Sequence, residues 1–155
     1  MELKKVNLYI DTSIRGPKRK AGAYGYVLEY KAAQGPVTRT KVEKTEYETT
    51  EHQSLCRALL EALKRIKTQC RLVIYTDCKY IGSVFSNHWI SEWFYNGWQT
   101  KKNTLVANAE LWKEIYDITK YLNVEVKVKE EHSYKEWLRR AVEEAANEDI
   151  CKAKP

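Results

Sequence analysis

Runs of apolar residues alternate with polar segments along the chain, and their lengths and spacing predict its elements. Five runs have the pattern of strands, at 6–11, 23–30, 37–47, 71–77 and 123–130. Short turn-forming stretches join the first three, so we expect them to form an antiparallel meander. The fourth, "RLVIYTD", is apolar almost throughout, which is typical of a parallel strand covered on both faces.

Helical periodicity occupies the segments between the later strands. "TEHQ" (50–53) fits a capping box in which Thr50 and Gln53 satisfy the first free amides, and apolar residues then recur on one face. Further helices are expected in a stretch from Asp77 into 88–103, at 108–122 and at 134–150. The order β-β-β-α-β-α-α-β-α predicts an α/β fold with a mixed sheet.

Composition limits the alternatives. The 155 residues show no repeat or linker, so a single domain over 1–155 is expected. No run approaches the roughly 18 apolar residues of a membrane span, and we find no signal peptide. Four scattered cysteines without a CxxC pair favour free thiols in the cytoplasm; they are Cys56, Cys70, Cys78 and Cys151. The net charge of +6 permits a nucleic-acid partner but does not require one.

Two aspartates end apolar strands. Asp11 lies in "LYIDTS" (8–13) and Asp77 in "IYTDCKYI" (74–81). An Asp in such a place is often only a turn former. Two strands that deliver a carboxylate each to one edge of a sheet would, however, create a place to hold a cation.

Several segments, in order, give the chain a resemblance to ribonuclease H of the bacterial, handle-containing type. "YIDTS" resembles the first strand of that family, and "IYTDCKYI" resembles its TD-S-x-Y-V segment. "WISEWFYNGWQTKKNTLVANAELW" (89–112) matches the Trp-rich handle and the start of the next helix. "VKEEHSYKEWLRRAVEEAA" (128–146) resembles the Val-Lys-Gly-His-Ser stretch and the last helix. The resemblance implies a ribonuclease H-like fold, with a five-stranded mixed sheet of three antiparallel and then two parallel strands, flanked by helices.

The resemblance also implies a chemistry. The family cleaves the RNA strand of RNA–DNA hybrids, with four carboxylates holding two Mg²⁺ ions. Asp11 and Asp77 match two of these carboxylates, and His132 matches the family histidine. The Glu position is occupied by Leu55, or by Ser54 if the alignment slips by one residue, and the last Asp position by Val142.

The two missing carboxylates leave several possibilities for the metal. Leu55 and Val142 suit the apolar faces of their helices, and two ions would keep about two uncompensated positive charges. Asp11 and Asp77 could instead hold one Mg²⁺ or Mn²⁺ weakly. A rebuilt site that uses Glu51 is a further alternative, whereas Glu143 is expected to face solvent.

Nucleic-acid contacts are expected from a basic loop, the start of the first helix and the handle. The residues concerned are Arg15, Lys18, Arg19, Lys20, Thr50, Trp89, Trp93, Trp98, Lys101 and Lys102. For the tryptophans, the alternative is packing of a small helical protrusion. The family's paired asparagines, which contact the ribose of the hybrid, are Glu51 and His52 here.

The sequence therefore predicts a ribonuclease H-like nucleic-acid-binding protein that is impaired or inactive as a nuclease. One alternative is an active Mg²⁺-dependent ribonuclease H with rearranged metal ligands. A second alternative is a protein-interaction or scaffold domain, which the basic loop disfavours.

Overall fold

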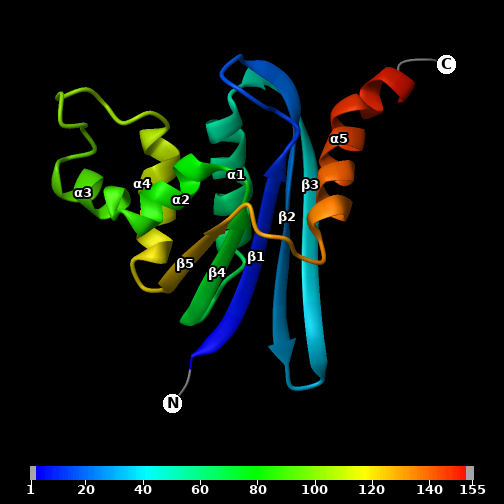
Figure 1. Cartoon of the computed structure of the whole chain (residues 1–155), viewed down its shortest axis with the longest axis horizontal. Coiled ribbons are helices and arrows are strands. Elements are labelled where there is room, and N and C mark those ends of the chain that lie inside the picture. The colour runs from blue at the N-terminus through cyan, green and yellow to red at the C-terminus, as the bar shows by residue number, and fades with distance from the viewer. Residues whose placement is uncertain (1–2, 153–155) are drawn as a thin grey trace.

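A computed structural model describes residues 3–152 as a five-stranded sheet with five helices (Figure 1). The strands are β1 (Lys4–Thr12), β2 (Lys20–Ala32), β3 (Gly35–Thr49), β4 (Cys70–Thr76) and β5 (Asn123–Val128). The helices are α1 (Glu51–Leu63), α2 (Lys79–Ser86), α3 (Trp89–Tyr95), α4 (Ala109–Thr119) and α5 (Lys135–Lys152). None of the helices within the described range has the length and hydropathy that crossing a bilayer requires.

The strand order is β3-β2-β1-β4-β5, with β3 and β5 at the edges. β1 pairs antiparallel with β2, and β2 pairs antiparallel with β3. β1 also pairs parallel with β4, and β4 with β5. The predicted arrangement of three antiparallel and two parallel strands is confirmed.

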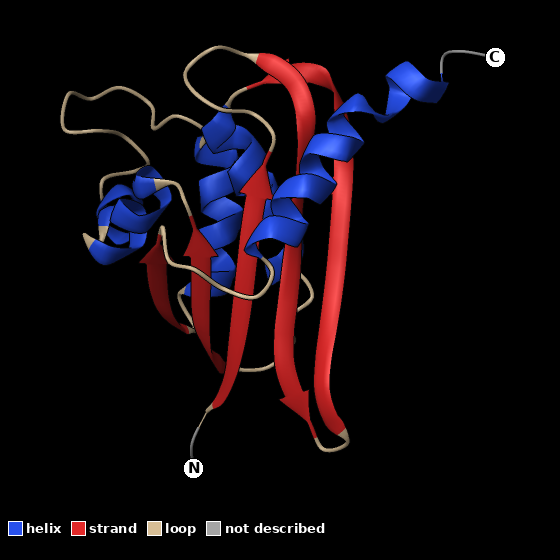
Figure 2. Ribbon diagram, turned by 45° about the vertical axis from the view of Figure 1, so that its right-hand side comes forward, coloured by secondary structure: helices blue, strands red, loops and turns tan. Residues whose placement is uncertain are grey.

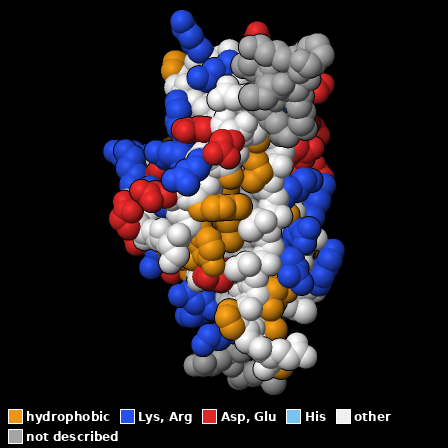
Figure 3. Space-filling model, turned by 90° about the vertical axis from the view of Figure 1, so that its right-hand side faces the viewer, with side chains coloured by type: hydrophobic (Ala, Val, Ile, Leu, Met, Phe, Trp, Pro, Cys, Tyr) orange, Lys and Arg blue, Asp and Glu red, His pale blue; other side chains and the backbone are white. Residues whose placement is uncertain are grey.

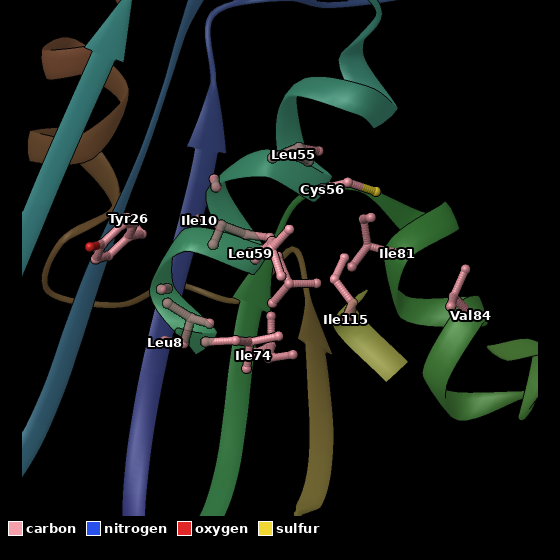
Figure 4. Packing of buried hydrophobic residues seen from close by; sticks show 14 of the residues in the cluster. Leu8, Ile10, Tyr26, Leu55, Cys56, Leu59, Ile74, Ile81, Val84 and Ile115 are labelled. Atoms are coloured by element: carbon pink, nitrogen blue, oxygen red, sulfur yellow. The ribbon is translucent and has the colours of Figure 1, made fainter. Parts of the chain in front are cut away.

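Helices cover both faces of the sheet (Figure 2). Alternate residues of β1 point to opposite faces, as the pleat of a strand requires. Leu8 and Ile10 join the main core beneath α1, with Leu59 and Ile74 (Figure 4). Tyr9 joins a second buried cluster beneath α5. The central strand is therefore buried on both sides, and its end is held rigidly.

The structure differs from the expected elements in three places. The helical stretch after Asp77 divides at His88, whose φ of 59° interrupts the helix, so three helices rather than two separate β4 from β5. β2 begins at Lys20, within the stretch expected as a loop. Only half of the capping box forms. The backbone N–H of Gln53 donates to Thr50 Oγ1, whereas the side-chain oxygen of Gln53 accepts from the hydroxyl of Thr49.

One side of the molecule is formed by β3 and α5. Viewed from that side, a band of apolar side chains runs between groups of Lys and Arg (Figure 3). β3 is 15 residues long and most of its side chains are exposed. This strand and β2 extend well beyond the end of α1 (Figure 1).

Three of the four cysteines, Cys56, Cys70 and Cys78, are buried free thiols, as expected. Burial raises the pKa of each of them, which keeps them protonated and unreactive. The side chain of Cys151 lies outside the described residues.

Candidate active site

Asp11 and Asp77 lie at the same end of the sheet, where the neighbouring strands β1 and β4 finish. β1 and β4 are parallel neighbours, and the pairing of Tyr9 with Tyr75 places the two aspartates two residues further along each strand. The side chain of Asp11 is 13% exposed and that of Asp77 is 36% exposed. Both line one small surface pocket together with His132 and Lys135.

A guanidinium group joins the two carboxylates. Arg139 of α5 places Nη2 2.7 Å from Asp77 Oδ2 and Nε 3.5 Å from Asp11 Oδ2. Arg15 lies 3.2 Å from the other oxygen of Asp11, and Lys135 lies 3.4 Å from the other oxygen of Asp77. Each carboxylate oxygen therefore faces a cation of this chain.

The electrostatics of Arg139 follow from this geometry. Burial alone would lower the pKa of Arg139, but attraction by Asp11 and Asp77 outweighs it, so that the pKa is raised. The guanidinium stays charged. The side chain is nevertheless 41% exposed, which leaves it room to move.

These residues do not fit two Mg²⁺ ions. Two ions about 4 Å apart need several anionic ligands to offset their repulsion. Here two carboxylates are already matched by three cations of this chain. Over residues 3–147, whose side chains the structure describes, no three His, Cys, Asp or Glu side chains converge in a group that could hold a metal.

His132 is held beside the aspartates by aromatic rings. Its ring centroid is 4.4 Å from that of Tyr9 and 5.4 Å from that of Tyr75. Its Nδ1 accepts the amide of Tyr134 at 3.2 Å. Burial, and then the charge of Lys135, lower the pKa of His132, so the neutral ring predominates at neutral pH.

The loop of His132 is tied to the sheet through one carboxylate. Glu29 accepts hydrogen bonds from Tyr134 at 2.9 Å and from Tyr9 at 3.1 Å. Asn7 donates to the same carboxylate at 3.1 Å. Burial opposes ionisation of Glu29, but the hydrogen bonds outweigh it and lower its pKa.

The positions expected to have lost carboxylates are all buried. Leu55 is 3% exposed and belongs to the main core (Figure 4). Its neighbour Ser54 is fully buried and shares a 2.8 Å hydrogen bond with Thr12, the residue after Asp11. Val142 is fully buried in the second cluster, and the α5 residues that contact the aspartates are Lys135 and Arg139, both earlier in the helix.

The basic loop lies next to the aspartates, but its members differ in environment. Arg15 is engaged with Asp11, and Arg19 donates to the carbonyl of Glu48 at 3.0 Å. Lys18 and Lys20 are exposed. Thr50 caps α1 with its hydroxyl.

The three tryptophans expected to contact nucleic acid pack against the protein. Trp89 and Trp93 stack at an angle to each other, with ring centroids 6.4 Å apart, and Trp93 also contacts the buried Trp112. Trp98 meets the ring of Tyr116. Tyr95 meets the ring of Phe94 edge-on but is 82% exposed, and Lys101 and Lys102 follow on an exposed turn.

Sequence reasoning missed the two cations of α5 that face the aspartates. Lys135 and Arg139 are four residues apart, so they lie on one face of the helix. Val142, three residues after Arg139, extends the same stripe into the second cluster. The signal in the sequence was the i, i+4 spacing of Lys135 and Arg139, two basic residues on the same helix face as the apolar Val142.

Comparison with known proteins identifies the family. The sequence profile of the RNase H family matches residues 3–148. The chain belongs to the ribonuclease H family. It is 32% identical over 149 residues to a protein of Clostridium botulinum named ribonuclease H, covering 94% of this chain and 95% of the relative. It is also 32% identical over 125 residues to a protein of the same name from Thermoanaerobacter, covering 80% and 77%.

Solved structures of the ribonuclease H family share the fold. LC9-RNase H1, described as a type 1 RNase H with the type 2 active-site motif, has a TM-score of 0.72 at 24% identity, over 96% of this chain and 74% of that one. A foamy viral protease–reverse transcriptase in complex with an RNA/DNA hybrid gives 0.64 at 17% identity, over 95% of this chain and 20% of that one.

Proposed function

We propose that this ribonuclease H-family protein binds nucleic-acid duplexes on the face that carries Asp11 and Asp77, and that it is impaired as a nuclease. The observation that carries the proposal is Arg139, whose guanidinium contacts both aspartates where family members place metal ions. A metal ion that entered between them would have to displace a charged group that lies 2.7 Å from Asp77 and 3.5 Å from Asp11.

The face has features that suit a nucleic-acid backbone. Lys18 and Lys20 are exposed in the basic loop that follows Asp11 and are available for phosphates. The segment from α3 to α4 resembles the family handle in sequence, and its exposed Tyr95, Lys101 and Lys102 suit contact with a strand. The related reverse transcriptase was solved with an RNA/DNA hybrid, which makes a hybrid the first ligand to test.

A second function is favoured by the comparisons. Relatives that are 32% identical over most of the chain are named ribonuclease H, and the family typically uses Mg²⁺. On this alternative, Arg139 swings into solvent when the hybrid binds, and Asp11 and Asp77 then hold Mg²⁺ or Mn²⁺. The exposure of the Arg139 side chain makes such a movement sterically feasible. Reduced thiols fit a cytoplasmic protein on either alternative.

Cleavage of an end-labelled RNA–DNA hybrid, with saturating Mg²⁺ and separately with Mn²⁺, tests the two functions. We expect the wild type to bind the hybrid in a gel shift but to cleave it at least 100-fold more slowly than a restored variant. The restored variant is Leu55→Glu with Arg139→Asp, which replaces the blocking cation by a carboxylate and adds one on α1. Leu55→Glu alone should remain slow, because Arg139 still occupies the site.

Two further variants fix the register. Ser54→Glu with Arg139→Asp should be active in place of the Leu55 variant if Ser54 occupies the lost Glu position. Val142→Asp in place of Arg139→Asp should restore nothing while Arg139 remains. Robust hybrid cleavage by the wild type that disappears in Asp77→Asn would overturn the impaired nuclease and establish the active enzyme.

A further inference from the structure

A second cavity lies at the end of the sheet opposite to the aspartates. It opens to solvent, has a volume of about 280 Å³, and is lined by the starts of β1 and β4, the far end of β2 and the turn after α1. Lys4 at its rim and Asp11 are seven residues apart on one strand, which is roughly 23 Å of extended chain. The cavity is therefore separate from the candidate active site.

Four cations line this cavity, and none of the described residues that line it is an acid. They are Lys4, Arg39, Arg65 and Lys67. Their hydrogen-bond partners are neutral oxygens: Arg65 Nε donates to Tyr26 at 2.8 Å, and Lys67 Nζ donates to the carbonyl of Lys64 at 2.8 Å.

The remaining two cations contact a neutral carbonyl oxygen and an aromatic ring. Arg39 Nη1 donates to the carbonyl of Thr38 at 3.2 Å. Lys4 Nζ lies 4.5 Å from the ring centroid of Tyr30. Four positive charges without a carboxylate among them repel one another, and an anion that entered the cavity would relieve that repulsion.

The floor of the cavity is apolar. Val6, Leu28 and Cys70 are buried core residues that also line the cavity, together with the partly buried Ile66. In this part of the molecule the β2–β3 hairpin extends beyond the end of α1 (Figure 1). The ligand that fits therefore combines a flat apolar part with a group that carries negative charge.

We propose that this cavity binds a nucleoside phosphate, with the base on the apolar floor and the phosphate on the arginines and lysines. Guanidinium groups suit phosphate oxygens because they can donate two parallel hydrogen bonds. The volume is at the lower end of the range for small-molecule sites, which suits one nucleotide rather than two. The ligand is either a free nucleotide or the phosphorylated end of a strand.

The test is a titration of the whole chain with AMP, followed by amide NMR shifts and calorimetry. We expect shifts at Tyr30 and Cys70, and binding at least tenfold tighter than that of inorganic phosphate. The variant Arg39→Gln/Lys67→Gln, which changes two exposed side chains, should weaken AMP binding at least tenfold. The matched control Lys113→Gln/Lys120→Gln removes the same charge from α4 and its C-cap and should leave the affinity within twofold.

Three outcomes would overturn the proposal. The first is that the amides of Tyr30 and Cys70 do not shift, even at 10-fold the AMP concentration that saturates any other amide. The other two are that inorganic phosphate or octyl phosphate binds with the same affinity as AMP. The source of the ligand is read from a 5′-phosphorylated trinucleotide. If its binding depends on Arg39 and Lys67 and exceeds that of AMP tenfold, the site takes strand ends. If AMP binds as tightly, the site takes free nucleotides. Hybrid binding by Arg39→Gln/Lys67→Gln should stay within twofold of wild type, which keeps this test independent of the proposed function.

Discussion

Replacing Arg139 with Gln should turn the face that carries Asp11 and Asp77 into a measurable Mg²⁺ site. In the wild type, the guanidinium contacts Asp77 at 2.7 Å and Asp11 at 3.5 Å. Gln keeps a hydrogen-bonding group at the position but removes its charge. The substitution therefore tests the repulsion of the metal by Arg139 rather than the packing of α5.

The size of the effect follows from Coulomb's law. A Mg²⁺ ion between the carboxylates would lie about 4 Å from the guanidinium, where the repulsion is about 2 kcal/mol in bulk water and about 8 kcal/mol at an effective dielectric constant of about 20. Because Arg139 is 41% exposed, the lower part of that range applies. A gain of about 2–4 kcal/mol corresponds to binding roughly 30- to 700-fold tighter in Arg139→Gln.

Thermal unfolding against Mg²⁺ concentration measures this gain. At a concentration about 100 times its Kd, the variant should gain about 2.7 kcal/mol, which for a chain of this size is a rise in Tm of about 5–11 °C. The wild type, if it binds about 100-fold more weakly, should gain only about 0.4 kcal/mol and rise by about 1 °C.

Arg140→Gln is the matched control, because Arg140 is the neighbour on the same helix and carries the same charge. Its Mg²⁺ dependence should equal that of the wild type. If wild type and Arg139→Gln respond equally to Mg²⁺, or if Arg140→Gln responds like Arg139→Gln, Arg139 does not exclude the metal.

Three other predictions concern the surroundings of the site. Lys18→Ala/Arg19→Ala should lower the log–log salt slope of hybrid binding by roughly 0.7 to 0.9 for each phosphate that the loop no longer neutralises, and an unchanged slope would exclude a role of the loop in binding. The NMR titration midpoint of His132 should lie below 6.5, because its folded pKa is lowered. The contribution of His132 to the free energy of unfolding is therefore present above pH 6.5 and declines as the pH falls below it. The substitution His132→Asn should flatten that decline. Tyr134→Phe should cost about 1 kcal/mol at pH 7 by removing a hydrogen bond to Glu29. Because the folded pKa of Glu29 is lowered, this cost should shrink as the pH falls below 4.5, and a cost that is equal at pH 3 and pH 7 would refute the role of that bond.

The fold was predictable because the spacing of apolar residues and the length of the turns reflect which segments are strands and how they pair. An apolar run that ends in Asp77 reads as a buried parallel strand, and the meander follows from short turns. The break at His88 was not predictable, since a positive φ at a histidine has no signal as strong as glycine would give.

The candidate site was predictable only in part. Strand ends located Asp11 and Asp77, but Arg139 reaches Asp77 from 62 residues away, and a basic residue on a helix reads as a solvated side chain until the helix is placed. The tryptophans illustrate the converse, because near-helical spacing fits both packing and stacking. Only the structure shows that Trp93 meets Trp112 and that Trp98 meets Tyr116, and their contact with nucleic acid stays a prediction.

The exposed edge of the sheet has a consequence for the behaviour of this protein at high concentration. An edge strand offers free backbone N–H and C=O groups to which another copy could add a strand and begin to aggregate. β3 is long enough for that, yet Pro36 stands near its start and it carries exposed charges of both signs, at Arg39, Lys41, Glu43, Glu46 and Glu48. A second copy that paired with it would have to strip water from several of these charges. The exposed charges of β3 thus help to keep separate copies of the chain apart.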